Sequence, residues 1–154
     1  MEAKNTKTMQ SHYRVVVIGG GVVGASVLYH LAKMGWTDVC MLERSVLTAG
    51  SSWHAAGGIH ALNADPNIAA LQAYTIDLLE VIQEESGQNI GLHMTGGLTM
   101  AGTPDRWEWL QSAYRVFQSI GIEDCRLVTP EEAGELNPIM STEGLLGGMW
   151  ADRE

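Results

Sequence analysis

Apolar and polar positions near the start of the chain alternate in a way that predicts a strand, a helix and a second strand. Residues 13–18 form a short β-branched run, which is typical of a parallel strand buried on both faces. A helix is predicted over 22–34, with Gly35 placed to end it, and a second strand over 38–43. The predicted inner face of the helix consists of Val23, Val27, Leu28, Leu31 and Ala32.

The pattern changes after residue 62, where helices and strands no longer alternate regularly. Helices are predicted at 66–86, 104–120 and 130–136, and strands at 90–93, 97–101 and 144–150. Thr103 before Pro104 is an N-cap signal, and the run from Thr129 to Glu132 is a capping box. In the helix over 104–120, Trp109 is expected to point away from the core.

This order of elements predicts an α/β fold, a Rossmann-like βαβ start that runs into an α+β segment. We expect a disordered tail at 1–12, a dinucleotide-binding segment at 13–62 and a partial α+β region at 63–154. A doubly wound nucleotide domain needs about four or five parallel strands. Because only two are predicted, the chain is expected to be incomplete, as an N-terminal fragment would be.

The turn between the first strand and helix has the spacing G-x-G-x-x-G, with Gly19, Gly21 and Gly24 at the glycine positions. The first glycine permits the tight turn, the second lets a pyrophosphate approach, and the third lets the helix pack closely on the strand. Val22 and Val23 open the helix, so their amides and the positive end of the helix dipole would face the phosphates. The pattern therefore predicts a dinucleotide site.

Glu43 ends the second strand at the distance from Gly24 expected for the acid that binds ribose hydroxyls. A glutamate would repel a 2′-phosphate, which favours FAD or NAD over NADP. Arg44 follows it directly and is a further candidate for cofactor binding.

Composition and net charge exclude several classes of partner and location. The chain has 154 residues, 45% of them hydrophobic, and a net charge of −9, which argues against nucleic acid or an anionic membrane as a partner. No apolar run is long enough for a membrane span, and the polar first dozen residues lack a secretory core, so the expected location is cytoplasmic. The two cysteines, Cys40 and Cys125, suggest neither a disulfide nor a metal site.

Five segments together resemble the dimethylglycine and sarcosine dehydrogenases of the D-amino-acid-oxidase-like flavoprotein superfamily. They are residues 16–24, 42–44, 47–57, 95–98 and 135–138. The glycine motif is common to many flavoproteins, whereas the Ser-Ser-Trp-His-Ala-Ala-Gly sequence within 47–57 is much more specific to this family.

The resemblance implies an FAD cofactor and assigns roles to three residues. In that family the histidine of the specific segment carries the flavin through its 8α-methyl carbon, and the matching residue is His54. A neutral imidazole is a suitable nucleophile for such a bond. By the same resemblance, Ser51 and Ser52 lie near the pyrophosphate and donate hydrogen bonds to it. A lone histidine beside a tryptophan is otherwise more often a packed or solvent-facing residue.

The resemblance further implies oxidation of an N-methylated glycine derivative by hydride transfer to the flavin, with electron-transfer flavoprotein or oxygen as acceptor. Folate would be a partner only if the protein has a C-terminal region beyond residue 154. No catalytic residue is identifiable here, and neither His60 nor His93 is assigned a role. Alternatives are another flavoenzyme of the superfamily, acting on D-amino acids or glycerol 3-phosphate, or a catalytically incomplete dinucleotide-binding fragment.

Overall fold

The computed structural model describes residues 9–154, so the first eight residues of the predicted tail lie outside the described part. The chain divides into two compact units, Met1–Gly57 and Gly58–Glu154, called here the N-terminal and C-terminal units. The predicted boundary after residue 62 falls a few residues inside the C-terminal unit.

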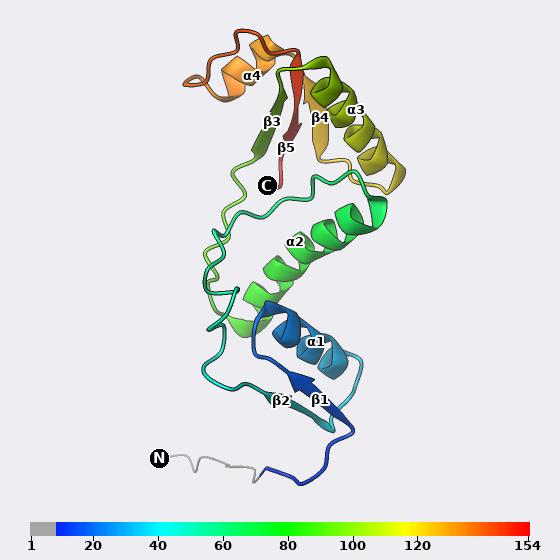
Figure 1. The fold of residues 1–154 in the computed structure, drawn as a ribbon, viewed down its shortest axis with the longest axis vertical. Coiled ribbons are helices and arrows are strands. Elements are labelled where there is room, and N and C mark those ends of the chain that lie inside the picture. Colours follow the sequence, from blue (N-terminus) through cyan, green and yellow to red (C-terminus); the bar gives the residue numbers. More distant parts are fainter. Residues whose placement is uncertain (1–8) are drawn as a thin grey trace. The chain divides into compact units, whose positions relative to one another are not determined.

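The N-terminal unit is a βαβ structure, as predicted. Strand β1 (Val15–Ile18) pairs in parallel with β2 (Val39–Leu42), and helix α1 (Val22–Lys33) connects them and packs against both (Figure 1). Gly35 ends the helix with a left-handed φ of 86°, and its amide donates to the carbonyl of Ala32 at 2.9 Å. The predicted helix end at Gly35 is therefore confirmed.

The prediction that the first strand is buried on both faces is wrong for this chain. Val17 is buried on the face that carries α1, whereas Val16 and Ile18 point to the other face, and Ile18 is 86% exposed. Val23 and Val27 on α1 are also exposed, which corrects the predicted inner face of that helix. The reason is that, among the described residues of this unit, α1 is the only helix and it covers one face of the sheet.

The C-terminal unit is built around a three-stranded antiparallel sheet with the order β3–β5–β4. Leu98 of β3 and Arg126 of β4 both lie opposite Trp150 of the central strand. The elements are α2 (Pro66–Ser86), β3 (Gly97–Ala101), α3 (Pro104–Ser119), β4 (Cys125–Val128), α4 (Pro130–Leu136) and β5 (Gly147–Ala151).

The helices of this unit begin at side-chain caps. Thr103 Oγ1 accepts from the Arg106 amide at 3.3 Å, and Thr129 forms the reciprocal capping box with Glu132, so both predicted helix starts are confirmed. Asp65 caps α2 by accepting from the amides of residues 67 and 68. Each cap satisfies amides that have no partner within the helix.

The core of the C-terminal unit lies between α3 and one face of the sheet. Leu110 and Phe117 of α3 are fully buried together with Met149 of β5. Trp109 is half-buried against this core, with the Arg106 guanidinium 4.1 Å from its ring centre, so the prediction that it points away is wrong.

Two further predictions fail in the C-terminal unit. Residues 90–93 are not a strand, because Gly91 adopts a left-handed φ of 72° that interrupts an extended backbone. On α2 the apolar spacing predicts one buried face made of Ile68, Leu71, Ile76, Leu79 and Ile82. The fully buried positions are instead Ala69 and Ile76, and Leu71 is 60% exposed. Strand β4 was not predicted, because its four residues carry no clear alternation.

Candidate cofactor site

A hollow in the N-terminal unit gathers most of the residues that the sequence singles out. It has a volume of about 580 Å³ and lies at the end of β1, beside the first turn of α1 and the segment 51–55. The predicted residues that line it are Gly19, Gly21, Val22, Val23, Gly24, Ser51 and Ser52. Glu43, Arg44 and His54 lie outside its lining.

The glycine loop is shaped by close backbone approaches. Gly19 has a φ of 106°, in the left-handed region that L side chains rarely adopt. A Cβ on Gly24 would collide with the Gly19 carbonyl oxygen, and one on Gly21 would lie 3.1 Å from Ser52 Oγ. The loop is thus a cradle that side chains would fill, which fits a group that must approach the backbone closely.

Glu43 is fixed against the glycine loop by two backbone amides. Its Oε2 accepts from Gly20 N at 2.8 Å and its Oε1 from Ser45 N at 2.9 Å. The Gly20 bond, followed by the Ser45 bond, lowers the pKa of Glu43 below its ordinary value, because both favour the ionised form. Each carboxylate oxygen keeps a further lone pair, so the side chain remains able to accept hydrogen bonds from sugar hydroxyls.

The turn at residues 47–54 is tied to the glycine loop at Thr48. This β-branched residue has a φ of 68°, a left-handed conformation that costs on the order of 1–3 kcal/mol. Its amide donates to Gly20 O at 3.0 Å, and its carbonyl accepts from Trp53 N at 3.1 Å. The strained residue therefore turns the backbone so that the turn follows the loop.

Ser52 provides a second tie, and His54 is oriented within the same turn. Ser52 Oγ accepts from the Val22 amide at 2.8 Å, across thirty residues of sequence. His54 Nδ1 lies 2.9 Å from the carbonyl oxygen of Gly50. Because a carbonyl oxygen only accepts, Nδ1 carries the proton in this contact, which leaves Nε2 with its lone pair in the neutral ring.

Two residues of this region are not predicted from the sequence. Gly20 had no assigned role, but its amide and carbonyl bind Glu43 and Thr48. Thr48 carries no recognisable signal, because the left-handed conformation of a single threonine follows from contacts distant in sequence. His60 and His93 belong to the C-terminal unit and do not line the hollow.

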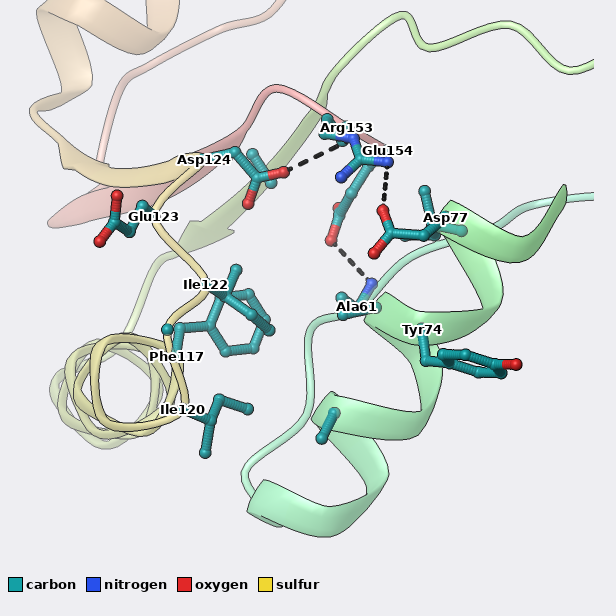
Figure 2. Close-up of a pocket in the computed structure, with 15 residues that line it drawn as sticks. Ala61, Tyr74, Asp77, Phe117, Ile120, Ile122, Glu123, Asp124, Arg153 and Glu154 are labelled. Atoms are coloured by element: carbon teal, nitrogen blue, oxygen red, sulfur yellow. Dashed lines mark hydrogen bonds and ion pairs between the residues drawn. The ribbon is translucent and has the colours of Figure 1, made fainter. Parts of the chain in front are cut away.

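A second cavity of about 500 Å³ lies within the C-terminal unit, between α2, the turn after α3 and the end of β5 (Figure 2). Arg153 forms ion pairs with two of the acidic side chains that line it. Arg153 Nη2 lies 2.6 Å from Asp77 Oδ1, and its Nε lies 3.9 Å from Asp124. Glu154 accepts from the Ala61 amide at 3.2 Å, and burial raises its pKa. These contacts fix α2 and its preceding segment to the end of the sheet.

The hollow in the N-terminal unit, together with Glu43 on the adjoining glycine loop, suits the ADP half of a dinucleotide. The amino end of α1 offers amides and a positive dipole end to a diphosphate, and Glu43 offers acceptors to ribose. Among residues 9–154, no cluster of side chains could hold a metal ion, and no helix has the length and hydropathy to cross a membrane.

The chain is similar to curated flavoenzymes. It is 38% identical over 136 residues to the mitochondrial dimethylglycine dehydrogenase of Rattus norvegicus, covering 88% of this chain and 16% of the relative. It is 32% identical over 150 residues to the mitochondrial sarcosine dehydrogenase of Homo sapiens, covering 97% of this chain and 16% of the relative. The chain thus spans about a sixth of the length of these relatives.

Solved structures and a family model agree with this similarity. The L-proline dehydrogenase of P. horikoshii matches with a TM-score of 0.83 at 25% identity, covering 94% of this chain and 38% of that one. The Rossmann-like α/β fold predicted from the sequence is therefore confirmed. The family model described as FAD dependent oxidoreductase matches residues 14–154. The chain belongs to the family of FAD-dependent oxidoreductases, and it is similar to the dimethylglycine and sarcosine dehydrogenases.

Proposed function

We propose that the protein that carries this chain oxidises N-methylated glycine derivatives, such as dimethylglycine or sarcosine, with an FAD bound at the glycine loop and attached to His54. The observation that carries this proposal is the orientation of His54, whose Nδ1 contacts Gly50 O and leaves Nε2 as the free nucleophile. The names of the similar dehydrogenases support the substrate class.

Each group of the N-terminal unit has a part in this proposal. Gly21 keeps the loop clear for the diphosphate, and Gly24 lets α1 pack closely on the end of β1. Ser52 binds the Val22 amide, so the amides of the first turn that follow Val22 donate to the diphosphate. Glu43 accepts from the ribose hydroxyls while the Gly20 amide keeps it ionised. When bound, FAD would supply the hydride acceptor for oxidation of an N-methyl carbon. Electron-transfer flavoprotein or oxygen would then accept the electrons.

The attachment is tested by denaturing the purified intact protein in acid and following flavin absorbance and protein together. Wild-type protein should keep its flavin on denaturation, and His54→Ala should release it. His93→Ala is the matched control, because His93 is exposed in the other unit, and it should behave as wild type. Release of all flavin from the wild-type protein would exclude the bond to His54.

The substrate class is tested by turnover with an artificial electron acceptor. Dimethylglycine and sarcosine should reduce the acceptor and yield formaldehyde, whereas a D-amino acid or glycerol 3-phosphate should not. Activity with only one of the latter substrates would favour the corresponding alternative flavoenzyme. Absence of bound flavin in the intact protein would favour a catalytically incomplete dinucleotide-binding protein.

A further inference from the structure

Helix α1 begins with a residue that cannot cap it. Gly21 is the N-cap and has no side chain, and even a Cβ there would lie 3.1 Å from Ser52 Oγ. The cap comes instead from Ser52, whose hydroxyl accepts the Val22 amide at 2.8 Å. Glycine at position 21 lets the diphosphate approach the backbone, but it leaves α1 without a side-chain cap from its own N-cap residue. Ser52, from the later turn, supplies that cap instead.

The Ser52 hydroxyl has a free donor where a diphosphate would bind. A serine hydroxyl has one proton and two lone pairs, and the Val22 amide uses one lone pair. The proton is therefore available to an acceptor in the hollow that Ser52 lines with the first turn of α1. A phosphate oxygen is such an acceptor, and its charge strengthens the bond.

Ser52 also lies inside the turn that orients His54. The amide of His54 donates to Ser51 O at 3.1 Å and its ring contacts Gly50 O at 2.9 Å, so both bonds span the position of Ser52. A displacement of Ser52 would therefore displace the imidazole. Its tie to Val22 holds this turn to the helix end that receives the phosphates.

We propose that Ser52 is a positioning residue that couples the pyrophosphate to His54: its hydroxyl accepts from the Val22 amide, donates to a pyrophosphate oxygen, and so aligns the imidazole with the flavin methyl group. This inference rests on the proposed function. Attachment joins His54 Nε2 to the methyl carbon, which loses one proton. The electron pair of the broken C–H bond passes to the flavin ring. Dioxygen takes the pair with two protons, one from the methyl carbon and one from Nδ1 of the alkylated imidazole, and leaves as hydrogen peroxide.

The first test measures binding of ADP and AMP to the intact, flavin-free protein by calorimetry. Ser52→Ala should weaken the binding of ADP about tenfold. The binding of AMP should not change, because AMP lacks the second phosphate. Ser52→Thr retains a hydroxyl and should restore ADP binding. Ser26→Ala, the same change on α1 outside the lining of the hollow, should match wild type. Wild-type ADP affinity in Ser52→Ala would overturn the phosphate contact.

The second test measures the rate at which added FAD becomes acid-stable in the same variants, at saturating FAD and in air. Ser52→Ala should slow attachment at least tenfold even at saturation, and Ser52→Thr should recover most of the rate. A wild-type rate at saturating FAD would overturn the coupling and reduce Ser52 to a phosphate ligand. Wild-type protein that never retains flavin would instead refute the attachment to His54, and the ADP comparison would still report the Ser52 contact.

Discussion

Replacing Gly24 by alanine has two opposite effects on the free energy of unfolding. Position 24 is the third residue of α1, where alanine is favoured over glycine by about 1 kcal/mol from helix propensity alone. The added Cβ, however, would collide with the Gly19 carbonyl oxygen and approach the Gly19 carbonyl carbon to 3.1 Å. Both are backbone atoms that cannot rotate away, so α1 must move from β1.

The net change in stability is the cost of the steric contact minus the gain in helix propensity. Overpacking costs about 1–3 kcal/mol, and a backbone clash belongs at the upper end of that range. After the gain from propensity, we expect Gly24→Ala to lower the free energy of unfolding by about 2 kcal/mol. The helix end would also leave the diphosphate position, so FAD occupancy should fall.

The assay is urea denaturation of the flavin-free intact protein, followed by titration with FAD. Gly58→Ala is the control, because a Cβ there meets no heavy atom within 4 Å and its stability should match wild type. A variant at position 24 that is as stable as wild type, or more stable, would show that propensity outweighs the contact. The steric argument for this glycine would then be refuted.

Three further predictions concern single side chains. Glu43→Gln should bind FAD more weakly. Because the folded pKa of Glu43 is lowered, its stabilisation is present above the ordinary glutamate pKa and lost as pH falls through the folded value. The difference in urea midpoint between wild type and variant should therefore shrink from about pH 6 to about pH 3, and a constant difference would contradict the role of the charge. Burial, and secondarily Asp124, raises the pKa of Cys125 to about 11, so iodoacetamide at pH 8 should label it on the order of a hundredfold more slowly than a free thiol, as followed by mass spectrometry. Labelling at the free-thiol rate would contradict its burial. Phe117→Ala should cost about 3–5 kcal/mol in urea denaturation, whereas the exposed Ser112→Ala on the same helix should be nearly neutral; equal losses would place Phe117 outside the core.

Features that depend on neighbouring residues could be predicted from the sequence. The helix starts at Thr103 and Thr129 rest on bonds to amides three residues later, and Gly35 ends α1 through a local left-handed turn. The glycine spacing at 19–24 likewise encodes a tight strand–helix turn in a single short segment. Such features can be predicted because the atoms that interact are separated by only a few residues of chain.

Pairing and burial depended on distant parts of the chain. Residues 97–101 pair with 147–151 rather than with the nearer 90–93, and Ile18 is exposed although its strand is wholly apolar. A hydrophobic pattern shows which side chains favour burial, but the elements that cover each face decide which are buried. The sequence could not supply that information for β1.

The candidate site shows the same division. The amino-acid sequence alone is enough to identify the glycine loop, the acid at Glu43 and the histidine of the specific segment. Only the tertiary structure brought Ser52 to the Val22 amide and Glu43 to the Gly20 amide, across thirty and twenty-three residues. A hydrogen bond forms wherever the folded backbone places donor and acceptor within about 3 Å, and no sequence pattern specifies that distance for residues so far apart.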